Sequence, residues 1–346
     1  MIDKAQRGIR GALFLASYRL GQTRVRHPPL VLNVEPTNRC NLRCPICPVS
    51  QQEQRPWVKR GFMSMELAEA VAKEVAAFRP LVAVNMGGES TLHPRLAEMI
   101  ICFHRVGCYV FLDTNATRLT PALSEALVNS GLDEIALCLD GDGSADSYEA
   151  IRVRARFDST VNGIRTFLDT RRRLGSDRPR TIVKNIQYFR SDGGLRFPVA
   201  LKRLFEDHPP DGYRATYADY WPGKHVDGLK TPYEIQPYAS GAYRACTNLW
   251  KKLAISWDGK VYACCLDLDR TTYVGDVTID GVMGVWNSPR MQELRLIHRQ
   301  GRQAELALCS RCTMIQRPPQ GRLAGLLKWR AERFTPFRDE TTHERS

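Results

Sequence analysis

The sequence predicts an α/β fold, a partial TIM-like barrel of six strand–helix units followed by a small cysteine-bearing C-terminal domain. Three observations support this prediction. Strand-like and helix-like runs alternate from residue 30 onward, the texture of the sequence changes from Tyr243, and cysteines gather in two separate regions. Repeated strand–helix alternation indicates βα units around a parallel sheet. Six units are fewer than the eight of a closed TIM barrel, so we expect an open barrel.

The first expected element is an amphipathic helix within residues 1–28, which have a basic start and a short apolar run. One interpretation packs this helix across the rest of the protein, and the other lays it on a membrane surface. We favour packing, because the run is short for stable binding to a membrane interface, and a membrane partner is not expected.

The barrel follows in residues 29–220. Its strands are predicted at residues 30–35, 81–86, 108–114, 134–139, 181–189 and 213–217. Its helices are predicted at residues 64–78, 95–106, 120–130, 145–151, 160–173 and 197–206. Beyond it we expect a linker rich in Pro, Gly and Tyr (221–245), the C-terminal domain (246–316) with a hairpin at 253–264 and a helix at 288–300, and a basic tail (317–346).

Composition limits the class of protein. The chain has 346 residues, 43% hydrophobic and 25% charged, which excludes a disordered tail, a small secreted knot and a multi-pass membrane protein. No window approaches the roughly 18 apolar residues of a transmembrane helix. A chain this long does not need its 11 cysteines as disulfide staples. A reducing, cytoplasmic location is therefore expected, where clustered cysteines favour metal or redox chemistry.

The net charge of +13 comes from basic residues spread over many short groups, including residues 171–173 and 295–302. We interpret these groups mostly as a solvated face. Such a face would also suit docking of an acidic electron donor, a flavodoxin or a ferredoxin, or an anionic substrate. No nucleic-acid motif accompanies the charge, so a nucleic-acid substrate is a minority interpretation.

The first cysteine group follows the first predicted strand, with Cys40, Cys44 and Cys47 spaced Cys-x3-Cys-x2-Cys. Three thiolates on one loop can hold three corners of an iron–sulfur cube. A four-iron cluster held only by cysteine needs four thiolates, so this loop would leave one iron open for chemistry. The alternatives are a zinc site with a distant fourth ligand and three incidental thiols.

The second group supplies four thiolates in the pattern Cys-x17-Cys-x44-Cys-x2-Cys: Cys246, Cys264, Cys309 and Cys312. Four thiolates are what a closed iron–sulfur cluster needs. A structural zinc site would use the same set. Cys265 adjoins Cys264, and the sequence does not decide which of the two is the ligand.

The first cysteine loop resembles the signature of the radical S-adenosylmethionine (SAM) enzymes, and further motifs of that superfamily recur in order at the ends of successive predicted strands. Gly87, Gly88 and Glu89 resemble the Gly-Gly-Glu segment that receives the SAM amino group. The resemblance extends to other positions, which would also lie close to SAM: Thr114 and Asn115, Cys138 and Arg152.

Three positions near these motifs depart from the family pattern, one of them Ser90, where relatives carry proline after Gly-Gly-Glu. The residue before the last cluster cysteine, which in relatives is usually aromatic and lies against the adenine, is Ile46. The residue after Asn115 is Ala116, where relatives carry glycine.

Residues 246–316 resemble the auxiliary-cluster region of SPASM and twitch radical SAM enzymes. With four cysteines and one neighbour, rather than about seven, the region is similar to the twitch type with one auxiliary cluster. The resemblance therefore implies SAM and two 4Fe–4S clusters, one binding SAM and one auxiliary, as cofactors.

Two spare thiols bear on the reaction. Cys138 and Cys265 are candidate hydrogen-atom donors to a substrate radical, although a packed thiol is the ordinary interpretation of each. We expect epimerisation at a carbinol carbon of a sugar or cyclitol-type natural product. The alternatives are oxidation of a secondary alcohol, peptide modification, and a non-catalytic metal-binding protein. Residues 1–29 are short for a leader-binding domain, which argues against a peptide.

Overall fold

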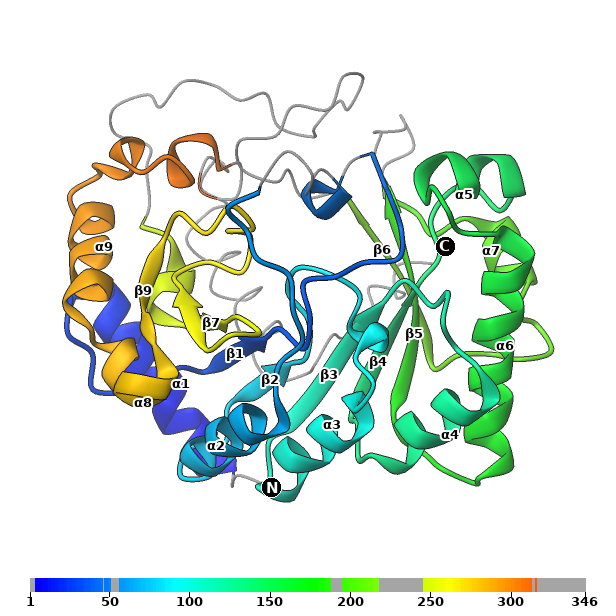
Figure 1. The fold of residues 1–346 in the computed structure, drawn as a ribbon, viewed down its shortest axis with the longest axis horizontal. Helices are drawn as coiled ribbons and strands as arrows, with labels where there is room; N and C mark the ends of the chain where they lie inside the picture. The colour runs from blue at the N-terminus through cyan, green and yellow to red at the C-terminus, as the bar shows by residue number, and fades with distance from the viewer. Residues whose placement is uncertain are drawn as a thin grey trace, which may run out of the picture.

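The computed structural model describes residues 4–45, 47–50, 56–187, 195–217, 245–312 and 315. One nine-stranded sheet runs through the molecule in the order β6-β5-β4-β3-β2-β1-β7-β8-β9 (Figure 1). The first six strands are β1 (Val31–Val34), β2 (Leu81–Ala83), β3 (Tyr109–Thr114), β4 (Glu134–Cys138), β5 (Arg180–Gln187) and β6 (Gly212–Tyr217). Each pairs in parallel with the next. The predicted partial barrel of six parallel strands is confirmed.

Helices follow the strands of the barrel as predicted. They are α2 (Met65–Val75), α3 (Leu96–Arg105), α4 (Pro121–Asn129), α5 (Ala145–Ile151), α6 (Phe157–Arg173) and α7 (Val199–Arg203). Several begin at a hydroxyl cap: the side chains of Ser64, Thr120 and Ser144 accept hydrogen bonds from backbone amides three residues on. Such caps satisfy amides that have no partner within the helix, which fixes where each helix begins.

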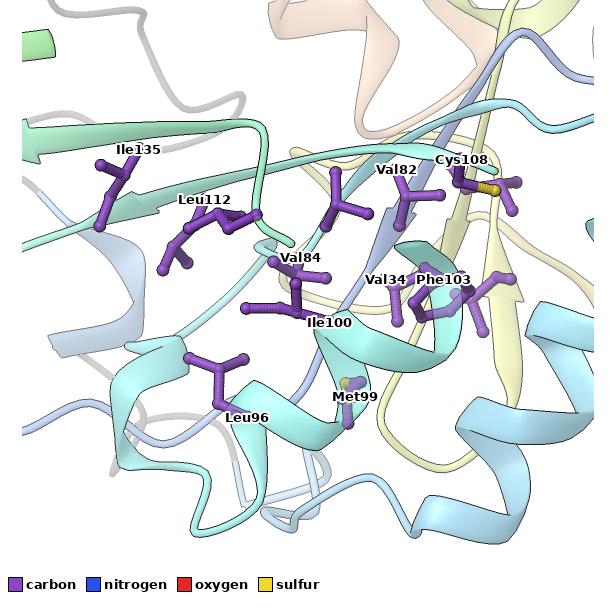
Figure 2. Packing of buried hydrophobic residues seen from close by; sticks show 14 of the residues in the cluster. Val34, Val82, Val84, Leu96, Met99, Ile100, Phe103, Cys108, Leu112 and Ile135 are labelled. Carbon is purple, nitrogen blue, oxygen red and sulfur yellow. The ribbon is translucent and has the colours of Figure 1, made fainter. Parts of the chain in front are cut away.

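One face of the sheet packs on the helices. Leu112 of β3, Ile135 of β4 and the α3 residues Ile100 and Phe103 all belong to the same buried core (Figure 2). Because side chains alternate across a strand, the residues between them belong to the opposite, inner face of the open barrel. In β4, Ala136 follows Ile135 and so lies on the inner face. Cys138 is two residues further on and therefore belongs to the inner face too.

The C-terminal segment continues the same sheet. Strand β7 (Lys252–Ile255) pairs in parallel with β1, and β8 (Lys260–Tyr262) and β9 (Tyr273–Asp276) add antiparallel strands at that edge. Helices α8 (Val277–Trp286) and α9 (Pro289–Arg299) cover this part (Figure 1). The sequence did not predict β9 or α8. Helix α8 contains a non-helical residue, Gly281 at φ 65°, which interrupts its apolar period.

Short 3₁₀ segments complete the description: η2 (Ser90–Leu92), η3 (Thr247–Trp250), η4 (Gln303–Glu305) and η5 (Cys309–Arg311). The predicted linker, apart from residue 245, and the basic tail lie outside the described residues. Arg295, which we expected on a solvated face, is fully buried. Its guanidinium donates hydrogen bonds to the backbone oxygens of Leu249, Thr23 and Trp286, and this pairing permits the burial of a charge.

The N-terminal helix α1 (Lys4–Arg19) packs on the C-terminal segment. Phe14 is buried, and the Tyr18 hydroxyl donates a hydrogen bond of 2.7 Å to the Ala245 oxygen. The Tyr18 ring also meets the ring of Trp250 edge to face. These contacts agree with packing, although Ile9 remains exposed on the other side of the helix. Within the described residues, no helix has the length and apolar character needed to cross a membrane.

Candidate active site

The three thiols of the first group lie on the loop after β1. Burial raises the pKa of Cys40 to about 12, and burial also raises the pKa of Cys47. In both cases repulsion from the Cys44 sulfur contributes to the rise in pKa, as expected for thiols that share one loop. The Leu42 amide donates to the Cys40 sulfur at 3.5 Å, and Nη1 of Arg152 donates to the Cys44 sulfur at 3.9 Å.

This donor set fits an iron–sulfur cluster. Cysteine thiolates are the ligands of such clusters, and hydrogen bonds to their sulfurs tune them. Within the described residues, no three His, Cys, Asp or Glu side chains are placed to hold a single metal ion. A four-iron cube holds its thiolates further apart than one ion does.

Gly88 brings the predicted SAM segment directly against this loop. Its φ is +127°, and a Cβ there would lie 2.5 Å from the Thr37 oxygen and 2.7 Å from the Arg39 oxygen. The Glu89 amide donates a 2.8 Å hydrogen bond to the same Arg39 oxygen. Only glycine allows this approach of two backbones.

The Glu89 carboxylate joins the predicted motifs to one another. Its Oε1 accepts hydrogen bonds of 2.7 Å from the hydroxyls of Thr91 and Thr114, and its Oε2 accepts one of 2.8 Å from the Asn115 amide. The Asn115 side chain in turn donates to Oδ1 of Asn41, between the first two cysteines of the loop. The motifs expected from the sequence therefore form one hydrogen-bonded unit.

Two further expectations concern residues around this unit. Ala116 has φ +61°, a left-handed conformation that glycine adopts more readily than alanine. Arg152 forms an ion pair of 2.7 Å with the buried carboxylate of Asp140 while its Nη1 faces Cys44. Ile46 lies outside the described residues.

Cys138 belongs to a polar row on the inner face of the barrel. It is the register partner of Lys184 on β5, and Lys184 Nζ reaches across β4 to Oδ2 of Asp113 at 3.0 Å. The small side chain of Ala136, the register partner of Asp113, leaves room for this crossing. Burial raises the pKa of Cys138 to about 12, so its thiol is protonated at neutral pH. The sequence analysis missed Asp113 and Lys184, although strand alternation could have indicated them.

A second charged group lies further along the same face. Glu134, at the start of β4, is buried and lies 3.6 Å from Arg180 and 3.9 Å from Arg214. Burial raises the pKa of Glu134 to about 7, against the partial opposition of the two guanidinium groups. The inner face of the barrel is therefore polar and charged along β4, unlike the apolar face that packs on the helices.

The four thiols of the second group are near one another in the C-terminal segment. Burial raises the pKa of Cys246 to about 11, with a contribution from Cys312. Burial also raises the pKa of Cys309, with contributions from Cys246 and Cys312. A hydrogen bond with Cys265, then burial, raises the pKa of Cys264, to which Cys246 also contributes. The set fits a cluster held by thiolates, and Cys265 lies beside it. The eleven cysteines, all within the described residues, form no disulfide.

An open parallel barrel with three thiols on the loop after its first strand, joined by sheet pairing to a segment with four more, defines a two-part iron–sulfur protein. Family comparison agrees: the radical SAM superfamily matches residues 34–190, and the SPASM iron–sulfur cluster-binding domain matches residues 246–313. The chain belongs to the radical SAM superfamily and carries a SPASM domain. Its cofactors are SAM and 4Fe–4S clusters.

The sequence similarity to curated relatives covers, for most of them, only part of this chain. The PqqA peptide cyclase of Ruegeria pomeroyi is 34% identical over 116 residues, 33% of this chain and 29% of that protein. The mycofactocin maturase MftC of Mycobacterium ulcerans is 28% identical over 297 residues, 77% of each chain. The chain spans about 30% of the length of the first curated relatives that it matches.

Solved structures share the fold. BtrN in complex with AdoMet and 2-DOIA has a TM-score of 0.53 at 14% identity, covering 82% of this chain and 92% of its own. SuiB of Streptococcus suis bound to the precursor peptide SuiA has a TM-score of 0.60 at 13% identity, covering 85% and 72%. At these identities the likeness concerns the fold alone.

Proposed function

We propose that this radical SAM enzyme acts on a carbinol carbon of a sugar or cyclitol-type natural product and inverts its configuration, with Cys138 returning hydrogen to the opposite face. The observation that carries the proposal is the thiol of Cys138 on the inner face of the barrel, buried and protonated. When bound, SAM and the cluster on Cys40, Cys44 and Cys47 supply a radical that removes a hydrogen atom from an unactivated carbon.

The chain's own residues support the remaining steps. A hydrogen-atom donor must carry an S–H bond, and the raised pKa of Cys138 keeps that bond at neutral pH. After transfer, the sulfur lacks one electron and one proton. Lys184, its register partner, has a pKa raised first by Asp113, so it stays charged at neutral pH and its charge favours the thiolate that forms when the sulfur gains an electron; water then supplies the proton. The electron comes from an external reductant, for which we propose flavodoxin or ferredoxin.

The remaining assignments are also proposals. Gly87, Gly88 and Glu89, with Thr114, Asn115, Arg152 and Ile46, are proposed to hold SAM. Cys246, Cys264, Cys309 and Cys312 are proposed to hold one auxiliary cluster, with Cys265 as the second candidate donor. Two four-iron clusters require about eight irons per chain, and an iron content of about twelve would contradict a single auxiliary cluster. Eleven cysteines without a disulfide support a reducing compartment, for which we propose the cytoplasm.

A peptide substrate is the second candidate. The sequence similarity to the PqqA peptide cyclase and to the mycofactocin maturase favours it. Oxidation of a secondary alcohol to a ketone is a third candidate, which the carboxylate of Asp113, on the same inner face of the barrel as Cys138, favours.

The test uses the reconstituted enzyme under strict anoxia with SAM and dithionite in deuterated water, offered panels of aminocyclitols, sugars and short peptides. Epimerisation predicts one solvent deuterium at one product carbon and no other change of mass. Cys138→Ala should still form 5′-deoxyadenosine while forming no epimer. Cys102→Ala is the matched control, because it also removes a thiol, here a half-buried one, but from helix α3 instead of from the inner face of the barrel. A product lighter by two hydrogens, or full epimerisation by Cys138→Ala, would refute the proposal.

A further inference from the structure

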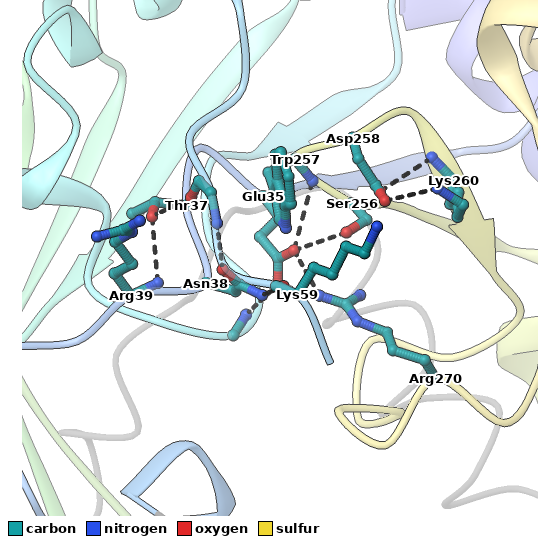
Figure 3. A network of polar contacts seen from close by, with 12 residues as sticks. Glu35, Thr37, Asn38, Arg39, Lys59, Ser256, Trp257, Asp258, Lys260 and Arg270 are labelled. Atoms are coloured by element: carbon teal, nitrogen blue, oxygen red, sulfur yellow. Dashed lines mark hydrogen bonds and ion pairs between the residues drawn. The ribbon is translucent and has the colours of Figure 1, made fainter. Parts of the chain in front are cut away.

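Glu35 ends the first strand and is completely buried. Its Oε1 accepts a 3.1 Å hydrogen bond from the Gly87 amide, which opens the segment proposed to hold SAM. Its Oε2 accepts hydrogen bonds from the Ser256 hydroxyl at 2.9 Å and from the Trp257 amide at 3.4 Å, and both belong to the turn between β7 and β8 (Figure 3). One carboxylate thus contacts the barrel with one oxygen and the SPASM segment with the other.

Arg270 neutralises this carboxylate from the loop that follows Cys264 and Cys265. Its Nη2 lies 2.6 Å from Oε2 of Glu35 (Figure 3). Its guanidinium also covers the Tyr262 ring at 4.7 Å. Arg270 has φ +63°, a backbone conformation that a non-glycine residue adopts only when its surroundings impose it. An ion pair of this depth needs both partners, because either charge alone would be costly to bury.

The loop that carries Arg270 is itself rigidly tied to the auxiliary thiols. The Asp267 amide donates to the Cys264 oxygen at 3.1 Å. The Asp267 carboxylate accepts hydrogen bonds from the backbone amides and hydroxyls of Thr271 and Thr272. A displacement of Arg270 is therefore carried to the residue that we propose as an auxiliary-cluster ligand.

Leu268, in the same loop, also contacts the SAM segment directly. A Cβ on Gly87 would lie 2.7 Å from Cδ2 of Leu268 and 3.0 Å from Oε1 of Glu35. Gly87 therefore provides the space in which the side chain of the SPASM loop and the carboxylate of the barrel meet. Any shift of the Gly87 backbone is felt by both.

We propose that Glu35 and Arg270 are positioning residues that couple SAM binding at residues 87–89 to the conformation of residues 256–272 in the SPASM segment. All four groups around the Glu35 carboxylate donate hydrogen bonds to it. A movement of the carboxylate that changes its hydrogen bond with Gly87 therefore also changes its hydrogen bonds with the SPASM segment. Coupling between two sites is reciprocal: if SAM orders the loop, disturbing the loop weakens SAM binding. The inference rests on the assignment of residues 87–89 to SAM, not on the identity of the substrate.

The experiment measures amide hydrogen exchange of the anaerobically reconstituted holoenzyme with and without SAM. In the wild-type protein, SAM should slow exchange both at residues 87–92 and at residues 256–272. In Arg270→Met, slowing at residues 87–92 should remain while slowing at residues 256–272 is lost, and the Kd for SAM should rise about tenfold, within the usual range of such couplings. Lys260→Met is the matched control, because it removes an exposed ion pair with Asp258 from the same segment, and it should behave as wild type.

Glu35→Gln provides a second variant, since it keeps the size of the side chain and breaks the ion pair from the barrel side, so that the charge left without its partner is that of Arg270 instead of Glu35. A Gln amide has one acceptor oxygen, so it can accept hydrogen bonds either from Gly87 or from Trp257 and Arg270 but not from both sides, and the SAM-dependent slowing at residues 256–272 should again be lost. Arg270→Lys, which keeps the charge, should restore at least half of the slowing. Wild-type slowing confined to residues 87–92, or full slowing at residues 256–272 in both Arg270→Met and Glu35→Gln, would overturn the coupling. No SAM-dependent slowing at residues 87–92 would overturn the SAM assignment itself.

Discussion

Replacing Gly88 by alanine should weaken SAM binding more than tenfold, and the structure indicates why Gly87→Ala beside it is a matched control for the loss of stability. The new methyl group at position 88 would lie 2.5 Å from the Thr37 oxygen and 2.7 Å from the Arg39 oxygen. Both are backbone atoms of the loop that leads into Cys40, so they cannot turn aside as a side chain can. The two segments would have to separate, which moves the SAM segment away from the cluster loop.

The cost has two parts. Alanine at φ +127° is strained by about 1–3 kcal/mol. Overpacking against backbone adds about 1–3 kcal/mol. A total of about 4 kcal/mol lowers the melting temperature by about 8 °C at 2 °C per kcal/mol, the lower end of the usual range for large domains. In Gly87→Ala, by contrast, the nearest atom is the end of the flexible Leu268 side chain, and we expect a cost of about 1 kcal/mol.

The assays are thermal unfolding, iron content after anaerobic reconstitution, and titration calorimetry with SAM. Gly88→Ala should melt about 8 °C below wild type and bind SAM more than tenfold more weakly. Gly87→Ala should melt within about 3 °C of wild type. If Gly88→Ala melts within 2 °C of wild type and binds SAM with unchanged affinity, the close backbone approach described here is wrong.

Three other changes test separate parts of the molecule. Burial raises the pKa of Glu134 to about 7, so between about pH 4.5 and 7 the folded state binds one more proton than the unfolded state. The free energy of unfolding should therefore fall by about 3 kcal/mol as the pH rises through this window. Glu134→Gln should flatten that dependence in melting curves from pH 5 to 8. Arg295→Met leaves the backbone oxygens of Leu249, Thr23 and Trp286 without this donor and should lower the melting temperature by more than 5 °C, whereas Arg299→Met, at the end of α9, should change it by less than 2 °C. Ala116→Gly should unfold within about 1 kcal/mol of wild type in denaturant, because relief of the strain at φ +61° offsets the lost methyl group, while Ala116→Val should be destabilised by more than 3 kcal/mol.

The parts of the site that the sequence predicted are those that depend on strand order. Parallel neighbouring strands end at one edge of a sheet, so motifs placed after successive strands must converge there. Glu89, Thr114 and Asn115 do converge, as the resemblance to radical SAM enzymes implied, through hydrogen bonds that the resemblance did not specify. The thiol of Cys138 could be placed on the inner face because side chains alternate between the two faces of a sheet along each strand.

What the sequence could not show depends on pairing between distant segments. Strand β7 joins β1 across more than 200 residues, and no periodicity in either strand encodes which partner it takes. The ion pair of Glu35 with Arg270 spans 235 residues. In the sequence, a glutamate at the end of an apolar strand looks like a boundary residue. Only the fold shows that Glu35 is buried and that it joins two distant segments.

The parallel pairing of β7 with β1 explains why these distant residues act together. Because both strands run in the same direction, the carboxyl end of β7 lies at the same sheet edge as the carboxyl end of β1, where Glu35 begins the cluster loop. The turn after β7 is thereby brought to the SAM segment, and Arg270 follows in the next loop. An antiparallel β7 would place that turn at the opposite edge, away from SAM. The strand direction is therefore what allows one carboxylate to hold both cluster-bearing parts of the enzyme.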